Sequence, residues 1–350
     1  MARVLLDYPH RMAGHCGSGA LRDLMEWAGL GWGGSSSEGL AFGIGGDLGF
    51  TYVRAGDLFP PVYLVGRGSD LELDALGRLG AEVQVLSGDD PVEGWEWVRA
   101  ELDAGRPTMV WADIGELPYL RVRLRMSRHD IVLIGYDDQE RVAFVVDNDR
   151  AEVQRVPYTD LARARSSTAF PLPTRHTTFR VRWPERPPVW EEVAADALET
   201  AGRRMLDGEN GTPVSPAGAG VAVASGVAGV ELFAGDVPRW PDLLGGDGTE
   251  VALRSLSVLV EKAGTGGGLF RRLQTSFCHE VAERTGCVLA DDAAHAYRAG
   301  ADTWSRLGAG AVGGGSLDSR LSLVAELARS VRDLERRAAE SLIEAAKALR

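Results

Sequence analysis

The chain is poor in the features that mark several protein classes. Of its 350 residues only three are cysteines, at positions 16, 278 and 287. An odd number at such wide spacing excludes a disulfide framework and favours a reducing compartment. No apolar run approaches the ~18 residues of a membrane span, and the N-terminus has no signal-peptide pattern. These absences predict a cytoplasmic protein with no membrane partner.

Positive charge is also in short supply. Lys and Arg total 38 against 50 Asp and Glu, which gives a formal net charge of −12. Nucleic acids and anionic membranes need a basic face, so this balance argues against both as the main partner. Hydrophobic residues make up 45% of the chain and charged residues 25%. These proportions are typical of a globular protein.

Length and pattern indicate two domains, because 350 residues exceed one ordinary core. The first half combines a helical pattern over residues 18–31 with short strands and a hairpin over 129–149, which predicts an α+β domain. Residues 170–188 hold five prolines, which break helices and central strands. We place the boundary there, giving domains 1–185 and 186–350, the second mostly α-helical.

Three segments have further readings. Residues 29–50 are dense in glycine but match no phosphate-binding loop, and we expect a loop that wraps the active site. Residues 214–235 are small and apolar, and fit either a buried helix or strands around glycine turns. The last helical stretch has an apolar stripe that fits either core packing or a homodimer seam. That stripe consists of Val324, Leu327, Val331, Leu334, Ala338 and Leu342.

Cys16 stands where the first helix should begin, in the stretch "HRMAGHCGSGAL". The unpaired N–H groups and the positive end of the helix dipole favour a thiolate there. Gly14, Gly17 and Gly19 would leave room for a substrate to approach the sulfur. A thiolate in such a place is a candidate nucleophile, whereas a buried cysteine would be inert.

A second motif supplies the partners that a nucleophile needs. His129 begins the apolar strand "HDIVLIGYDD", and Asp147 ends the next one, "VAFVVDND", 18 residues later. A hairpin would place them side by side, so that Asp147 orients His129 and the other ring nitrogen serves Cys16. Asp149 is the alternative orienting residue. For the oxyanion of an acyl transfer, the candidate donors are the Cys16 backbone N–H and His10.

A helix-opening cysteine, then histidine at a strand start and a later aspartate, resembles papain-like cysteine enzymes, in particular bacteriocin-processing peptidases. The stretches "PHRMAGHCGSGALRDLM", "SSEGLAFGIGGDLGFTYV" and "RHDIVLIGYDD" resemble the N-terminal domain of the butirosin biosynthesis protein H family. The stretches "EKAGTGGGLFRRLQTSFCHEVAERTG" and "DTWSRLG" resemble the helical domain that accompanies it. The resemblance therefore covers most of the chain.

The resemblance implies an acyltransferase of antibiotic and other natural-product biosynthesis. Such an enzyme moves an acyl group from an acyl carrier protein thioester, or from coenzyme A, to an amine of a small molecule. Cys16 would take the acyl group, His129 would act as the base and Asp147 would orient it. His10 stands where papain relatives have an oxyanion-hole glutamine. No cofactor is implied beyond the acyl-phosphopantetheine thioester of the donor. The resemblance does not imply which acceptor molecule is used.

Four further residues are candidates for substrate binding. Glu38 is a polar anchor within the glycine-dense segment. Arg121, Arg123 and Arg125 alternate with apolar residues, so on a strand they would share one face. That face would be either solvated or a docking patch for an acidic carrier protein.

Other functions stay open at this point. Cys278, His279, Cys287 and His295 have spacings that match no zinc pattern, so we expect no metal. An acyl acceptor that reacts through carbon instead of an amine nitrogen would use the same acyl-enzyme. Water as the acceptor would make the chain a cysteine peptidase or amidase, and a third reading is a non-catalytic scaffold on a peptidase fold.

Overall fold

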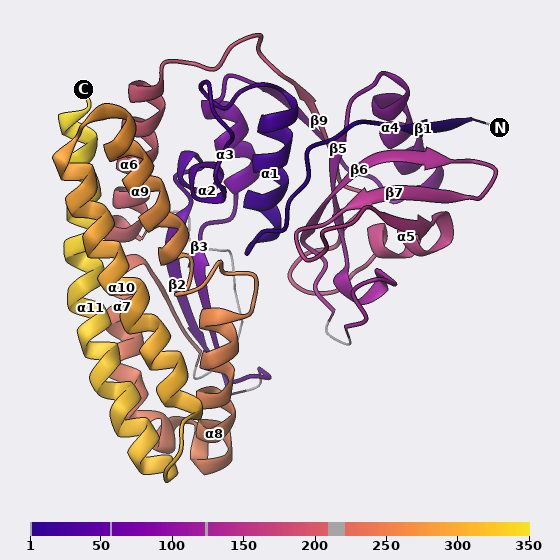
Figure 1. Cartoon of the computed structure of the whole chain (residues 1–350). Helices are drawn as coiled ribbons and strands as arrows, with labels where there is room; N and C mark the ends of the chain where they lie inside the picture. Colours follow the sequence, from indigo (N-terminus) through magenta and orange to yellow (C-terminus); the bar gives the residue numbers. More distant parts are fainter. Residues whose placement is uncertain (1, 57, 123–124, 209–220) are drawn as a thin grey trace. The chain divides into compact units, whose positions relative to one another are not determined.

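The computed structural model of the chain is shown in Figure 1. It describes residues 2–56, 58–122, 125–208 and 221–350. Helices are combined with antiparallel strands, and long helices dominate the C-terminal half. The predicted α+β class is therefore confirmed.

The chain divides into two compact units. The first holds Met1–Ala41 and Leu76–Pro188, and the second holds Phe42–Ala75 and Val189–Arg350. Residues 42–75 are predicted as part of the first domain, whereas in the structure they pack with the C-terminal helices. Two helices contain the crossing points, α2 (Glu38–Ile44) and α3 (Leu71–Arg78).

A single antiparallel sheet forms the centre of the first unit. Within the described residues its strands are β1 (Arg3–Leu5), β4 (Glu82–Leu86), β5 (Thr108–Ala112), β6 (His129–Asp137), β7 (Val142–Val146), β8 (Gln154–Pro157) and β9 (Thr178–Arg182). Their order is β4–β9–β5–β6–β7–β8, with β1 paired to β6. The central strand β6 is buried along its whole length.

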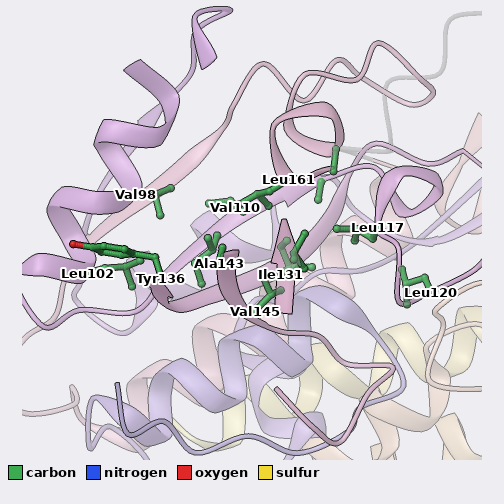
Figure 2. Packing of buried hydrophobic residues seen from close by; sticks show 14 residues of the cluster. Val98, Leu102, Val110, Leu117, Leu120, Ile131, Tyr136, Ala143, Val145 and Leu161 are labelled. Atoms are coloured by element: carbon green, nitrogen blue, oxygen red, sulfur yellow. The ribbon is translucent and has the colours of Figure 1, made fainter. Parts of the chain in front are cut away.

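Helices cover both faces of this sheet. They are α1 (Cys16–Trp27), α4 (Pro91–Asp103) and α5 (Tyr158–Arg165), and a short 3-10 helix, Ile114–Glu116, follows β5. On one face Ile131 packs with Val98 and Leu161 (Figure 2). On the other face Val132 packs with Leu24 of α1. Each fully buried aliphatic side chain contributes about 1.5–3 kcal/mol, so the two layers hold β6 firmly.

The second unit combines a small sheet with long helices. Its strands, in the order β10–β2–β3, are β2 (Leu48–Arg54), β3 (Val62–Arg67) and β10 (Ala222–Ser225). Its helices are α6 (Trp190–Asp207), α7 (Gly226–Asp236), α8 (Trp240–Glu261), α9 (Arg271–Thr285), α10 (Val288–Val312) and α11 (Leu317–Ala348), with a 3-10 turn at Val237–Arg239. Helices α10 and α11 run side by side in Figure 1. The helical patterns predicted for the C-terminal half are confirmed.

Two ambiguous segments are decided by the structure. The described part of residues 214–235 contains both a strand and a helix, because β10 is followed directly by α7. The apolar stripe of the last helix, α11, is core packing. Five of its six residues are buried within the unit, and Leu334 is half-buried. The stripe therefore gives no support to a homodimer seam, and a homodimer stays a prediction.

The prediction of one loop over residues 29–50 was wrong. This segment contains α2 and the start of β2. Glycine is needed there for close packing rather than for a loop, since a Cβ on Gly43 would lie 1.9 Å from the Phe277 ring. Phe42 stacks on Phe270, with ring centroids 5.5 Å apart. These aromatic contacts hold residues 42–50 in the second unit.

A buried ion pair joins three helices of the second unit. Arg271 of α9 and Glu335 of α11 are both almost fully buried, and Nε lies 2.7 Å from Oε1. The indole N–H of Trp304 in α10 donates to the same oxygen at 2.7 Å. Arg271 also donates to the carbonyls of Gly66 and Leu269. A charge buried this deeply is tolerated only while its partner remains.

We expect Glu335→Gln to destabilise the chain by about 3–5 kcal/mol, because Arg271 would remain buried without its counter-charge. Glu231 is the matched control, since it pairs with Arg336 at 2.7 Å but both side chains are about half exposed. Glu231→Gln should cost less than about 1 kcal/mol. Urea unfolding of the full chain measures both values, and equal losses would contradict this assignment.

Candidate active site

Cys16 is the first residue of α1 and is partly exposed. His15 before it has extended backbone angles and caps the helix, because its Nδ1 accepts from the Ser18 N–H at 3.2 Å. The N–H groups of Cys16 and Gly17 belong to the first turn, where no intrahelical acceptor exists. They and the helix dipole favour negative charge on the sulfur.

Glu38 of α2 holds the loop that presents this cysteine. Its Oε1 accepts from the His15 N–H at 2.9 Å and from the Ser18 hydroxyl at 3.0 Å. Its Oε2 accepts from the Gly14 N–H at 2.9 Å. Both carboxylate oxygens are thus engaged inside the protein. The geometry is that of an anchor, whereas the predicted substrate contact would need one of these bonds to break.

His129 and Asp147 lie at the same end of the β6–β7 hairpin. His129 Nε2 is 2.8 Å from Asp147 Oδ2, and both residues are buried. The Tyr119 hydroxyl donates to the same carboxylate oxygen at 2.7 Å, and the Asp149 N–H donates to the other at 3.1 Å. Asp147 is therefore the residue that contacts the imidazole, and Asp149 contributes only through its backbone. Nδ1 of His129 is left for Cys16.

The charges of these residues support one another. Burial raises the pKa of Cys16, but the charges and hydrogen bonds of His15 and His129 hold it well below that of an ordinary thiol. Burial lowers the pKa of His129, but Asp147 and Cys16 hold it well above that of a free imidazole. Burial also raises the pKa of Asp147, and its contacts with His129 and Tyr119 keep it below the usual range. These opposite shifts favour a thiolate at Cys16 and an imidazolium at His129.

Asp130 is a further acidic group at the sulfur, and it was not predicted from the sequence. Its Oδ2 lies 3.8 Å from Cys16 Sγ, within reach of a thiol hydrogen bond, and its side chain is buried. Strand alternation places Asp130 on the same face as Val132, the face that α1 covers. Strand alternation was the signal in the sequence that could have indicated Asp130. The prediction instead paired Cys16 with His129, the residue before Asp130.

His10 is placed close to the nucleophile but is fully engaged. Its Nδ1 lies 2.9 Å from Asp23 Oδ2, and its Nε2 lies 2.7 Å from the Arg150 carbonyl. Both partners only accept, so both ring nitrogens donate. Burial lowers the pKa of His10, but the hydrogen bonds to Asp23 and Arg150 raise it above its ordinary value overall. An oxyanion role for His10 would require one of these bonds to break, which leaves the Cys16 N–H as the simpler candidate donor.

A small cavity of about 10 Å³ lies between His10 and Cys16. It is about large enough for one water molecule. Asn148 also lines it and clamps the loop before Cys16, with Nδ2 donating to the Ala13 carbonyl at 3.1 Å and the Ala13 N–H donating back at 3.0 Å. A Cβ on Gly19 would lie 2.6 Å from that of Ala13. The space beside Gly19 is therefore filled by the clamped loop rather than left for substrate.

The arginine face proposed for substrate binding is not formed as predicted. The described part of residues 119–128 contains no strand, and Arg121 has a left-handed backbone (φ 55°). Arg123 lies outside the described residues. Arg125 pairs with Asp113 at 2.7 Å and with Glu116 at 3.2 Å. Its guanidinium is committed to the protein's own carboxylates.

Cys278 contrasts with Cys16. It is fully buried in α9, and burial raises the pKa of its thiol to about 12. It is therefore an inert thiol. No cluster of three or more His, Cys, Asp or Glu side chains with metal-binding geometry occurs in the described part of the chain. Nor is any helix there long and apolar enough to cross a bilayer.

Comparison with known protein families adds to this geometry. Residues 15–148 match the family model "Butirosin biosynthesis protein H, N-terminal", and residues 159–342 match "Domain of unknown function (DUF4872)". The chain belongs to the butirosin biosynthesis protein H-like family. The first match contains Cys16, His129 and Asp147, whereas His10 precedes it. The name of this family indicates a biosynthetic role in antibiotic production. No curated protein matches the chain.

In this butirosin protein H-like chain, Asp147→Asn should lower the pKa of His129 and raise that of Cys16, because the imidazolium loses its counter-charge. A cysteine reacts as the thiolate, which predominates only when the pH exceeds the thiol pKa. Iodoacetamide labelling of Cys16 should therefore fall about tenfold or more at pH 6 and recover near pH 9.5. Asp149→Asn is the matched control and should leave the profile unchanged. Peptide mapping distinguishes Cys16 from partly exposed Cys287. An unchanged profile in Asp147→Asn would contradict the pair.

Glu38→Ala tests whether this carboxylate anchors the nucleophile or binds substrate. We expect slower alkylation of Cys16 at every pH and a loss of stability of about 1–3 kcal/mol, because two backbone N–H groups and a hydroxyl lose their acceptor. No substrate is present in these measurements. Normal labelling and stability, with an effect only on the KM of a substrate, would instead assign Glu38 to substrate binding.

Proposed function

We propose that the chain is a cysteine-dependent acyltransferase of antibiotic biosynthesis. It would move an acyl group from an acyl carrier protein or coenzyme A thioester, through Cys16, to an amine of a small molecule. The observation that best supports this proposal is the 2.8 Å contact of His129 with Asp147 beside Cys16 at the start of α1, where the pKa of the thiol is lowered and that of the imidazole is raised. The family to which the chain belongs supports the biosynthetic setting.

In the first half-reaction the Cys16 thiolate attacks the carbonyl carbon of the donor thioester. A carbon–sulfur bond forms to Cys16, and the Cys16 N–H stabilises the oxyanion. The bond to the donor sulfur then breaks, and His129 gives its proton to the departing thiolate. The products are an acyl-Cys16 thioester, a free donor thiol and a neutral His129.

In the second half-reaction the amine attacks the acyl-Cys16 carbonyl in its neutral form. His129 accepts the proton that the nitrogen loses, and the sulfur of Cys16 leaves as the thiolate. An amide is formed and the starting pair is restored. Asp147 holds the imidazole in orientation through both steps.

Asp130 supports an amine rather than carbon as the acceptor. Its Oδ2 lies 3.8 Å from Sγ, where it can accept a hydrogen bond from the N–H of an amine that approaches the acyl group. A carbon nucleophile has no N–H for that bond. The same first half-reaction followed by attack of water would be peptidase or amidase chemistry, and a scaffold would react at neither step.

The proposal is tested by intact mass after the full chain is mixed with a carrier protein bearing a short acyl group. We expect the acyl mass on the wild type and none on Cys16→Ala. Simple primary amines should then discharge the acyl-enzyme at least about tenfold faster than water, with amide as the product. Equal discharge by water would favour a hydrolase. No adduct with any donor, together with cleavage of peptides, would overturn acyl transfer.

A further inference from the structure

A second hollow in the first unit lies away from Cys16. It has a volume of about 470 Å³, within the range of small-molecule sites. Its wall includes the C-terminal end of α1, the end of α4 and the last residues of β9. The side chains that matter here are Trp27, Trp183, Arg106, Arg180, Arg182 and Glu101. Trp27 is eleven residues from Cys16 along α1, so the two sites are about 16 Å apart along the helix axis.

The hollow lies where the ladder between β5 and β9 ends. β9 pairs with β5 only at two positions, Met109 with Phe179 and Val110 with Thr178. Continued by one and two residues, this register sets Thr108 against Arg180 and Pro107, which has no N–H to offer, against Val181. Because β5 begins at Thr108, the last two residues of β9, 181–182, have no partner from β5. The backbone itself opens the cleft.

The cleft is positively charged in an acidic chain. Glu101, whose side chain is 5% exposed, forms ion pairs with Arg106 at 2.6 Å and Arg180 at 3.0 Å. One carboxylate balances one of these two cations. Arg182 is exposed and makes no ion pair within the described residues. Three arginines against one glutamate thus leave two positive charges in a chain of net charge −12.

Two indoles stand beside these cations. Trp27 and Trp183 are each partly exposed, and neither N–H has a hydrogen-bond partner among the residues that the structure describes. Tryptophan offers a flat face on which another ring can stack, with a donor at its edge. Arginine adds a planar fork that matches phosphate and carboxylate oxygens. Indole rings and guanidinium groups on the same wall therefore favour a ligand that combines an aromatic ring with an anionic group.

We propose that this cleft binds a small planar aromatic ring that carries a phosphate or carboxylate group. The ring would stack on Trp27 or Trp183, and the anion would pair with Arg182. Such chemistry has two sources, a nucleotide or an aromatic acid. The inference is independent of the acyl transfer proposed above, because it concerns binding at the other end of α1.

Isothermal titration calorimetry of the full chain tests it with four probes. Adenosine 5′-monophosphate and benzoate carry both groups, adenosine carries only the ring, and inorganic phosphate carries only the anion. We expect a Kd below about 1 mM for adenosine 5′-monophosphate or benzoate. Adenosine and inorganic phosphate should bind at least about tenfold more weakly. Tighter binding of the nucleotide or of benzoate then identifies the source. Equal binding of phosphate and the nucleotide, with no binding of benzoate, would overturn the proposal, as would no binding of either ring-bearing anion.

Substitution of Arg182 locates the site. Arg182→Gln should weaken the better ring-bearing anion about five- to tenfold. Arg186→Gln is the matched control, because Arg186 is also exposed but does not line the cleft. This variant should bind the same ligand with wild-type affinity. The rate of Cys16 alkylation should be unchanged in both variants, since neither touches the nucleophile. Equal affinities in Arg182→Gln and Arg186→Gln would overturn the assignment.

Discussion

The register between β6 and β7 is the constraint on which the candidate site depends. Val132 lies opposite Val146, so His129 and Asp147 end up at the same end of the hairpin, 2.8 Å apart. A slip of one residue would move every side chain of β7 to the opposite face. The two packed layers on β6 prevent that slip, because each face buries its own apolar set. The core thus determines the geometry of the polar site.

The same end of β7 also positions the nucleophile. Asn148, the neighbour of Asp147, pairs with Ala13 through both its side chain and its backbone. From the other side Glu38 holds the N–H groups of Gly14 and His15. The cysteine and its base are therefore placed by adjacent residues of one strand end rather than by two independent loops. Such mutual bracing keeps a reactive pair in place without substrate.

Much of this arrangement could be predicted from the sequence, for physical reasons. The helix start at Cys16 and the hairpin that joins His129 to Asp147 follow from local periodicity and turn residues. Tyr119 could not be predicted, because it comes from an irregular segment whose position depends on tertiary contacts. The transfer of residues 42–75 to the second unit was missed because no change in composition marks it. The ring of His10 was expected to be available, and only the fold reveals Asp23 and the Arg150 carbonyl as its partners.

The proton of His129 gives the proposed cycle an order. Before acylation, the imidazolium of His129 lies between Asp147 and the sulfur of Cys16. The donor thiol leaves with the proton of His129, and the thiolate is consumed in the same half-reaction. Acylation therefore removes one positive and one negative charge, and the net charge of the site does not change. What changes is the imidazole, which becomes a neutral base only after the donor thiol has left. The amine needs that base to accept the proton that its nitrogen loses on attack, so the donor reacts first and the amine second.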